Sequence, residues 1–228
     1  MKRLLLIITL ILLSKIAFAQ WSVGAYGGVN ITSIDRSQAG RIDETYNPLL
    51  GHHLGAKATY AVNSWFAIRA DLNVMQRNHR MQRHIDYLSP VYTDHVNAYL
   101  TLPLMADFSF GTERLRGNLL LGGFAGYWLR QRVRGTTYGM TDYEVFFNDF
   151  DEQRPFTSKD YRFDAGLLGG MALSYSFNSH IDLSLDALLY YDLISHHKGY
   201  LNLQDYRYLT TSSLTLGISY IITKKEQP

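Results

Sequence analysis

Residues 163–191 alternate between apolar and polar side chains on both sides of a central Asn178-Ser179 turn. Because successive side chains of a strand point to opposite faces, this segment predicts a β-hairpin with one apolar and one polar face. Its arms exceed the usual strand length of about five or six residues. The apolar face ends at Tyr175 on one side and at Tyr191 on the other. Long alternating strands with aromatic ends are typical of transmembrane β-barrels.

The same alternation recurs along the chain and predicts eight strands. We expect these strands at residues 21–32, 52–61, 65–77, 95–109, 117–130, 163–177, 180–191 and 207–222. Long polar connections, at 33–51, 78–94, 131–160 and 192–206, alternate with short turns. Outer-membrane barrels have short periplasmic turns and long outer loops. The pattern therefore predicts an all-β fold, an eight-stranded antiparallel up-and-down transmembrane β-barrel whose long loops lie outside the cell.

A soluble lipocalin-like barrel, which also has eight strands, is the alternative. Such a barrel buries its apolar residues inside and shows polar ones outside. Here the polar face carries charges at matched depth on several strands, and aromatic residues bound a wide apolar face, which favours the membrane barrel. We interpret the aromatic residues at the strand ends as interface girdles; they are Trp21, Tyr60, Trp65, Tyr127, Tyr175, Tyr191, Tyr208 and Tyr220.

One residue conflicts with this strand pattern. Pro103 lies inside the predicted strand 95–109. Proline cannot donate a ladder hydrogen bond, and a closed barrel has no free edge on which to place it. We therefore expect a bulge or a locally loosened pairing at Pro103.

The N-terminus has the pattern of a secretory signal peptide. Lys2 and Arg3 precede an apolar run at residues 4–13, and Ala17-Phe18-Ala19 offers a small-x-small cleavage site. The run is shorter than the roughly 20 apolar residues of a membrane-spanning helix. We expect residues 1–19 to be a signal peptide and residues 20–228 to be the barrel domain.

The charge of the mature chain excludes some partners. Removing Lys2, Arg3 and Lys15 from the 22 basic residues leaves 19, against 20 acidic residues. The chain then has neither a basic tract nor a net charge that suggests nucleic acid as a partner. It has no cysteine, which excludes disulfides and a lipid-modified cysteine.

The predicted inward face carries nearly balanced charge. Its predicted cations are Lys57, Arg69, Arg162 and Arg207, and its predicted anions are Asp71, Asp107, Asp164, Asp182 and Asp186. Eight strands enclose a space that side chains can just fill. A buried charge without a partner is costly, so we expect a polar, paired and filled lumen that conducts no substrate. A narrow pore lined by the same charges is the alternative.

Four segments resemble the PorT-like family of bacterial outer-membrane β-barrel proteins. They are residues 99–105 (YLTLPLM), 121–127 (LGGFAGY), 163–173 (FDAGLLGGMAL) and 213–220 (SLTLGISY). The chain departs from the family pattern at Thr101, two residues before Pro103, where the family often has an acidic residue. The resemblance implies an outer-membrane barrel, and it implies a link to protein secretion only through the family's best-known member.

The histidines are the candidates for catalysis or metal binding. They lie at or near the predicted outer rim and loops, where Asp94 or Asp192 could join them; they are His52, His53, His79, His84, His95, His196 and His197. No nucleophile-elbow motif and no helical metal-binding spacing accompanies them. We therefore predict no catalytic residue, no cofactor and no metal site, and interpret these histidines as rim residues in the lipopolysaccharide zone.

Two classes of function follow. The first is a non-enzymatic, structural or accessory barrel that contacts lipid and lipopolysaccharide and binds a protein partner through its extracellular loops. Aromatic residues in loop 131–160, including Tyr138, Phe146 and Phe147, are candidates for that recognition surface. The second is a small barrel enzyme that acts on lipid or peptide.

Overall fold

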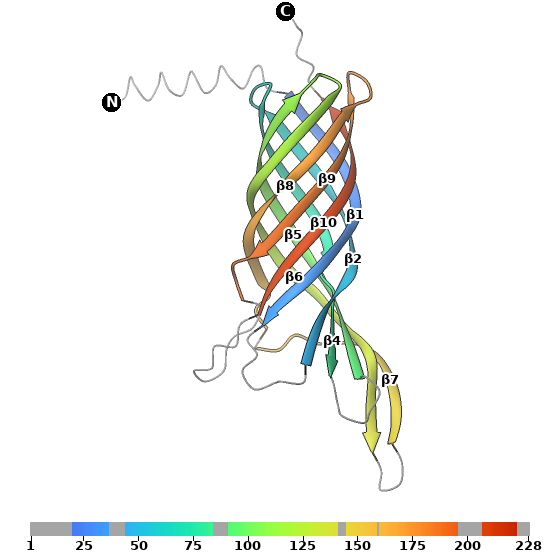
Figure 1. Ribbon diagram of the computed structural model, residues 1–228. Helices are drawn as coiled ribbons and strands as arrows, with labels where there is room; N and C mark the ends of the chain where they lie inside the picture. The colour runs from blue at the N-terminus through green and yellow to red at the C-terminus, as the bar shows by residue number, and fades with distance from the viewer. Residues whose placement is uncertain are drawn as a thin grey trace, which may run out of the picture.

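The computed structural model describes residues 20–36, 44–83, 91–140, 145–158, 160–195 and 207–222, which form one antiparallel sheet of ten strands. The strands are β1 (Gln20–Arg36), β2 (Glu44–Ala61), β3 (Phe66–Gln76), β4 (His79–Arg83), β5 (Val91–Gly111), β6 (Leu115–Met140), β7 (Val145–Gln153), β8 (Phe163–Ser176), β9 (Ile181–Asp192) and β10 (Arg207–Ile221). Figure 1 shows the sheet rolled into a barrel, with strands that continue beyond it at one end. No helix among the described residues has the length and hydropathy to cross a bilayer.

Hydrogen bonding closes the sheet into a ring, because β1 pairs with both β2 and β10. The ring continues from β2 through β3, β5, β6, β8 and β9 to β10, and all neighbours are antiparallel. β4 continues the path of β3 between β2 and β5, whereas β7 pairs with β6. The fold is thus an up-and-down β-barrel, and ring closure satisfies the backbone groups that a bilayer could not.

Tight turns join the strands at one end, which we call the turn end. The Asn63 side chain accepts hydrogen bonds from the backbone N–H groups of Trp65 and Phe66. The Asn178 side chain does the same for His180 and Ile181. Such side chains stabilise a turn by replacing a backbone acceptor. These hydrogen bonds stabilise the short turns that the sequence predicts.

The predicted facing of the strands is confirmed along the barrel. The leucines expected to face lipid are all exposed; they are Leu72, Leu104, Leu167, Leu185 and Leu216. The intervening positions are buried in the lumen, as at Asp71, Asp164 and Asp186. A barrel with apolar residues outside and charged residues inside is the reverse of a soluble barrel.

Ten strands replace the eight that the sequence predicts, because three predicted loops contain strand residues. β1 and β2 shorten loop 33–51, β4 and the start of β5 lie in loop 78–94, and the end of β6 and all of β7 lie in loop 131–160. These segments lack a continuous apolar face, so alternation could not reveal them. We call residues 44–50, 79–83, 91–97, 130–140 and 145–153 the sheet extension, and its end of the barrel the extension end (Figure 1).

Pro103 loosens one pairing, as predicted, but carries no bulge. Between β3 and β5 the register passes from Ala70–Leu104 to Asn73–Thr101, so the pairing skips Pro103 and its neighbour Leu102. Against β6, Pro103 pairs in regular register with Phe124. The register shift between β5 and β6 lies at Ala98 and Tyr99 instead.

Candidate functional site

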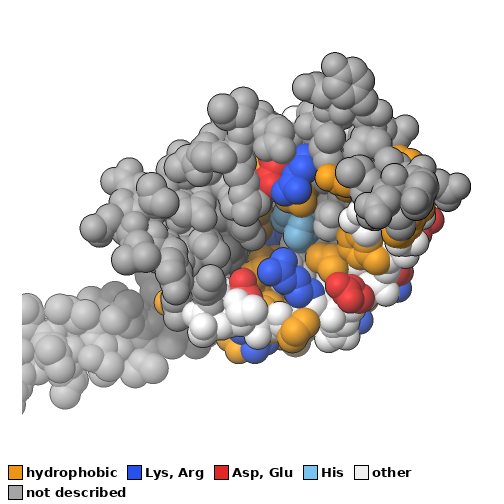
Figure 2. All heavy atoms as spheres, turned by 90° about the horizontal axis from the view of Figure 1, so that it is seen from below, with side chains coloured by type: hydrophobic (Ala, Val, Ile, Leu, Met, Phe, Trp, Pro, Cys, Tyr) orange, Lys and Arg blue, Asp and Glu red, His pale blue; other side chains and the backbone are white. Residues whose placement is uncertain are grey.

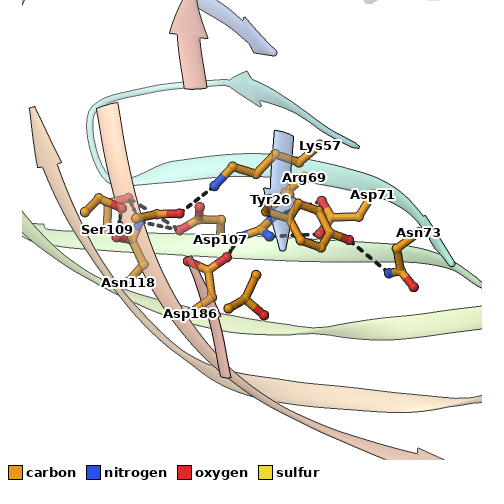
Figure 3. Close-up of polar contacts among 12 residues, drawn as sticks. Tyr26, Lys57, Arg69, Asp71, Asn73, Asp107, Ser109, Asn118 and Asp186 are labelled. Carbon is orange, nitrogen blue, oxygen red and sulfur yellow. Dashed lines mark hydrogen bonds and ion pairs between the residues drawn. The ribbon is translucent and has the colours of Figure 1, made fainter. Parts of the chain in front are cut away.

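Arg69 is the centre of a buried charge network inside the barrel. Its guanidinium donates two hydrogen bonds to Asp71, at 2.9 and 2.8 Å, and lies 2.7 Å from the Asp186 carboxylate. Figure 3 shows Arg69 and Asp71 of β3 meeting Asp186 of β9, with Lys57 of β2 beside them. Lys57 donates to the Ser184 hydroxyl at 2.6 Å. The predicted pairing of inward charges is therefore confirmed for Arg69, Asp71 and Asp186.

Neutral polar groups extend this network across the lumen. Asn73 donates to the Tyr26 hydroxyl at 2.9 Å and accepts a hydrogen bond from Thr101. Asn118 donates to Asp107 at 2.7 Å (Figure 3). Buried polar groups need such partners, and a connected set of them holds the facing strands in one arrangement.

A polar cavity of about 160 Å³ lies between this network and the turn end. Its lining includes Lys57, Arg69 and Asp107, together with Arg116 and Asp182 nearer the rim. Arg116 and Asp182 form an ion pair at 2.6 Å. The cavity is thus lined by charges of both signs, most of them already paired.

The lumen is less polar than predicted, because one side of it is filled by apolar side chains. This cluster contains Met75, Met105, Leu120, Phe124, Leu168, Ala172, Leu188 and Tyr190. Seven of the eight come from β5, β6, β8 and β9, whereas the charged network draws mainly on β2 and β3. The count of inward charges could not show this apolar side of the lumen. Where apolar residues also point inward, the sequence of the strand merely alternates less clearly.

Arg77 closes the lumen nearer the extension end. Its guanidinium is fully buried and lies 2.6 Å from Asp164 and 3.0 Å from Asp192. The rings of Tyr99, Phe124 and Tyr190 lie 5.1, 5.1 and 6.0 Å from its guanidinium carbon. Ion pairs and cation–π contacts together compensate the cation for its lost water.

An aromatic layer covers Arg77 on its outer side. Tyr99 stacks on Trp128 at 5.7 Å, and Phe156 meets Trp128 edge-on at 5.0 Å. Leu209 and Ile34 complete this layer. Phe156 follows β7 in sequence, so the chain folds back over the mouth of the barrel before it enters β8.

The prediction that Arg162 is a cation of the lumen is wrong. Arg77 is the cation that pairs with Asp164 there. Arg162 donates to the Trp128 carbonyl, and its guanidinium lies over the rings of Tyr127 and Phe156. It precedes β8, so it remains at the rim instead of pairing with Asp164. Arg77 shares the inward parity of Arg69, and extending that parity could have found it. The side chain of Arg207 lies outside the described residues.

The sheet extension carries its own ion pairs. Arg80 binds Asp94 through two hydrogen bonds of 2.6 and 3.0 Å, and Arg83 contacts Glu44 at 2.9 Å. The hydrogen bond with Asp94 raises the pKa of Arg80 above its usual range. Figure 2 looks onto this end and shows basic and acidic side chains gathered around a histidine.

The β6–β7 hairpin presents aromatic side chains at its far end. Tyr138, Phe146 and Phe147 are exposed to solvent. Phe146 lies opposite Gly139, and a side chain added at Gly139 would meet its ring. The hairpin is held by the two hydrogen bonds from Arg132 to Asp151, both 2.6 Å, and by Thr136 donating to Asp149. Loop 131–160 is thus mostly a β-hairpin with an aromatic end.

Of the candidate histidines that the structure describes, it brings His79 and His95 together and keeps His52 and His53 apart from them. His52 faces outward, whereas His53 is buried and 2.8 Å from the Thr215 hydroxyl. His79 and His95 stack at 4.7 Å in the sheet extension. Asp94 and Asp192, their suggested partners, pair with Arg80 and Arg77. His84, His196 and His197 lie outside the described residues. Within the described ranges, no group of three potential ligands is arranged to hold a metal.

Comparisons with known proteins agree with this geometry. A family model described as outer membrane protein beta-barrel domain matches residues 18–196. OprG from Pseudomonas aeruginosa has a TM-score of 0.54 at 14% identity, over 89% of this chain and 96% of that chain.

Two further barrels are similar at lower scores. Neisserial surface protein A has a TM-score of 0.46 at 17% identity, over 89% of this chain and 97% of that chain. Ail of Yersinia pestis has a TM-score of 0.40 at 14% identity, over 88% and 98%. No curated protein matches the sequence. At these identities, the OprG likeness concerns the fold alone.

Proposed function

We propose that this chain is a closed, non-enzymatic barrel that binds a partner through its sheet extension. The chain belongs to the family of outer membrane protein beta-barrel domains and resides in the outer membrane of a Gram-negative bacterium. The observation that carries this proposal is the β6–β7 hairpin. β6 runs for 26 residues, continues past the barrel, and pairs with β7 beneath the exposed rings of Tyr138, Phe146 and Phe147.

The orientation and strand count of the barrel are part of the proposal. Eight paths cross the membrane, with β3 and β4 as one interrupted path and β7 outside the bilayer. Residues 1–19 are removed as a signal peptide, and residues 20–228 form the mature barrel. Short turns at one end and long strands at the other support a periplasmic turn end and an extracellular sheet extension.

A closed lumen favours a function at the surface of the barrel over transport through it. Arg77, its two carboxylates and the aromatic layer fill the section of the barrel nearest the sheet extension. A solute would have to break buried ion pairs and displace stacked rings to pass. The polar cavity near the turn end favours a second candidate, a narrow porin.

Exposed aromatic residues on a hydrogen-bonded hairpin are suited to binding another protein. Aromatic side chains supply large contact area at low entropic cost and dominate many interfaces. The PorT-like resemblance makes an accessory role in secretion one form of this proposal. The alternative class, a small barrel enzyme, has no catalytic constellation in its favour among the described residues.

Site-specific photocrosslinking in intact cells tests the proposal. A photoreactive phenylalanine analogue at Phe147 should form a protein adduct, because its ring is exposed at the end of the hairpin. The matched control is Phe177, another exposed phenylalanine, which lies at the turn end. Adducts at neither position, or the same adduct at both, would contradict a partner-binding hairpin.

A further inference from the structure

A bulge in β6 turns three arginines to the outside of the barrel. Ala98 pairs with Arg130, but the next residue, Tyr99, pairs with Trp128, so Leu129 is the extra residue. Both Leu129 and Arg130 are exposed, and beyond them Gln131 and Val133 are buried while Arg132 and Arg134 are exposed. In a regular strand, Arg130, Arg132 and Arg134 would share the inward parity of Trp128. The bulge re-aims them to the outer face, a known use of bulges at barrel rims.

These arginines lie next to the lipid-facing band of β6, on the side toward the extension end. On β6 the outward apolar residues run from Leu115 to Tyr127, and Leu129 is also exposed. Strands rise about 3.4 Å per residue and tilt by about 40°, so residues 115–127 span roughly 30 Å along the membrane normal. That height matches the hydrocarbon core of a bilayer. The three guanidinium groups therefore lie at the level of lipid headgroups.

The local charge is positive after the internal ion pairs are considered. Arg132 is bonded to Asp151, and Asp94 is held by two hydrogen bonds from Arg80. Arg134 reaches Asp94 only at 3.6 Å. Arg130 has no ion pair within the described part of the chain. Asp149 lies on the same face of β7 as Asp151, so four arginines face three aspartates on this surface. A surplus of one positive charge remains at the headgroup level.

We propose that Arg130, Arg132 and Arg134 bind phosphate groups on the headgroup of the outer-leaflet glycolipid. Arginine pairs with phosphate through two parallel hydrogen bonds, and Arg130 and Arg134 have donors available for this. Long arginine side chains can also reach down toward the headgroups while their stems cover apolar surface. The outer-leaflet source rests on the extracellular orientation proposed above; the phosphate chemistry rests on the bulge and the charge surplus.

Native mass spectrometry of the purified mature barrel in detergent tests this inference. The probes are bisphosphorylated lipid A, dephosphorylated lipid A with the same acyl chains, inorganic phosphate and dextran sulfate. We expect retention of bisphosphorylated lipid A and loss of retention without its phosphates. One arginine near an anionic surface contributes about 1 kcal/mol, so R130Q should weaken binding about fivefold. The triple variant R130Q/R132Q/R134Q should weaken it further, and R114Q, exposed at the turn end, should not.

Each contrary result has a defined meaning. Equal retention of the two lipids, or equal loss from R130Q and R114Q, would overturn the site. Saturation by inorganic phosphate or dextran sulfate at the concentrations of lipid A would replace the glycolipid with a soluble anion. Arg130 forms no ion pair with any described residue, so a loss of binding in R130Q would not come from a disrupted hairpin. Failed crosslinking at Phe147 with intact lipid A binding would count against the proposed function alone.

Discussion

At the scale of single residues, Arg77 is the most consequential side chain in the barrel. It is fully buried between Asp164 and Asp192, so R77M would remove a cation that both buried carboxylates contact. Breaking a buried ion pair from one side costs about 3–5 kcal/mol. We expect R77M to lower the free energy of unfolding by that amount, measured by urea titration in lipid vesicles.

A matched variant separates charge from packing at this position. R77M combined with D164N and D192N also removes both carboxylate charges and should recover part of the loss. R162M should cost less than R77M, because Arg162 lies on rings and a backbone carbonyl at the rim. If R77M unfolds at the urea concentration of the native protein, the closed layer does not depend on this cation.

A second residue-scale prediction concerns facing. L216R places a charge on the lipid side near the middle of β10 and should cost about 2–4 kcal/mol. Ser184 and Thr215, on the inward parity, are poor controls because both are buried and hydrogen-bonded. Ser219 lines the polar cavity, so S219R is the matched control and should cost less. Equal losses from L216R and S219R, in the same urea titration, would contradict the facing assignment.

At the scale of elements, the β6–β7 hairpin depends on charge pairs outside the membrane. The hydrogen bonds from Arg132 lower the pKa of Asp151 below its usual value. A lowered pKa means that the carboxylate's contribution to hairpin stability is present above the ordinary aspartate range, about pH 3.9, and is lost as pH falls through the lowered value. NMR titration of the Asp151 carboxyl carbon should show this value, and R132Q should return it to the ordinary range. An unchanged titration in R132Q would exclude Arg132 as the cause.

At the scale of the whole molecule, the filled lumen predicts an absence of conductance. The purified protein in planar bilayers should show no stable open channel, because charged, apolar and aromatic layers occupy successive sections. A Y99A/W128A variant thins the aromatic layer but leaves Arg77 in place, so it should also remain closed. Steady ohmic current from the unaltered protein would support the narrow porin instead.

The orientation of the molecule is tested by cysteine labelling of intact cells, since the native chain has no cysteine. A cysteine at Arg83 should react with an impermeant reagent, whereas cysteines at Asn63, Glu113 or Ser179 should be protected. The further extracellular positions that the sequence suggests, Arg41, Thr141 and Gln204, lie outside the described residues. Labelling of the turn positions with protection of Arg83 would reverse the barrel.

The sequence by itself determines which residues face lipid and which face the lumen. Alternation with a period of two is a local property of a strand, and a bilayer demands an apolar residue at nearly every outward position. The positions of most barrel strands, the tight turns and the outward leucines could therefore be predicted. Arg69, Asp71 and Asp186 could be placed inside for the same reason.

Only the tertiary structure decides what each inward residue meets. Strand tilt and stagger set which side chains share a level in the lumen, so Arg77 rather than Arg162 pairs with Asp164. The strands of the sheet extension have no apolar face, because they lie beyond the bilayer that imposes one. The bulge at Leu129 depends on pairing with β5, so the outward turn of Arg130, Arg132 and Arg134 could not be inferred from β6 alone. Local alternation thus determines the wall of the barrel, and contacts between distant strands determine its interior and its rim.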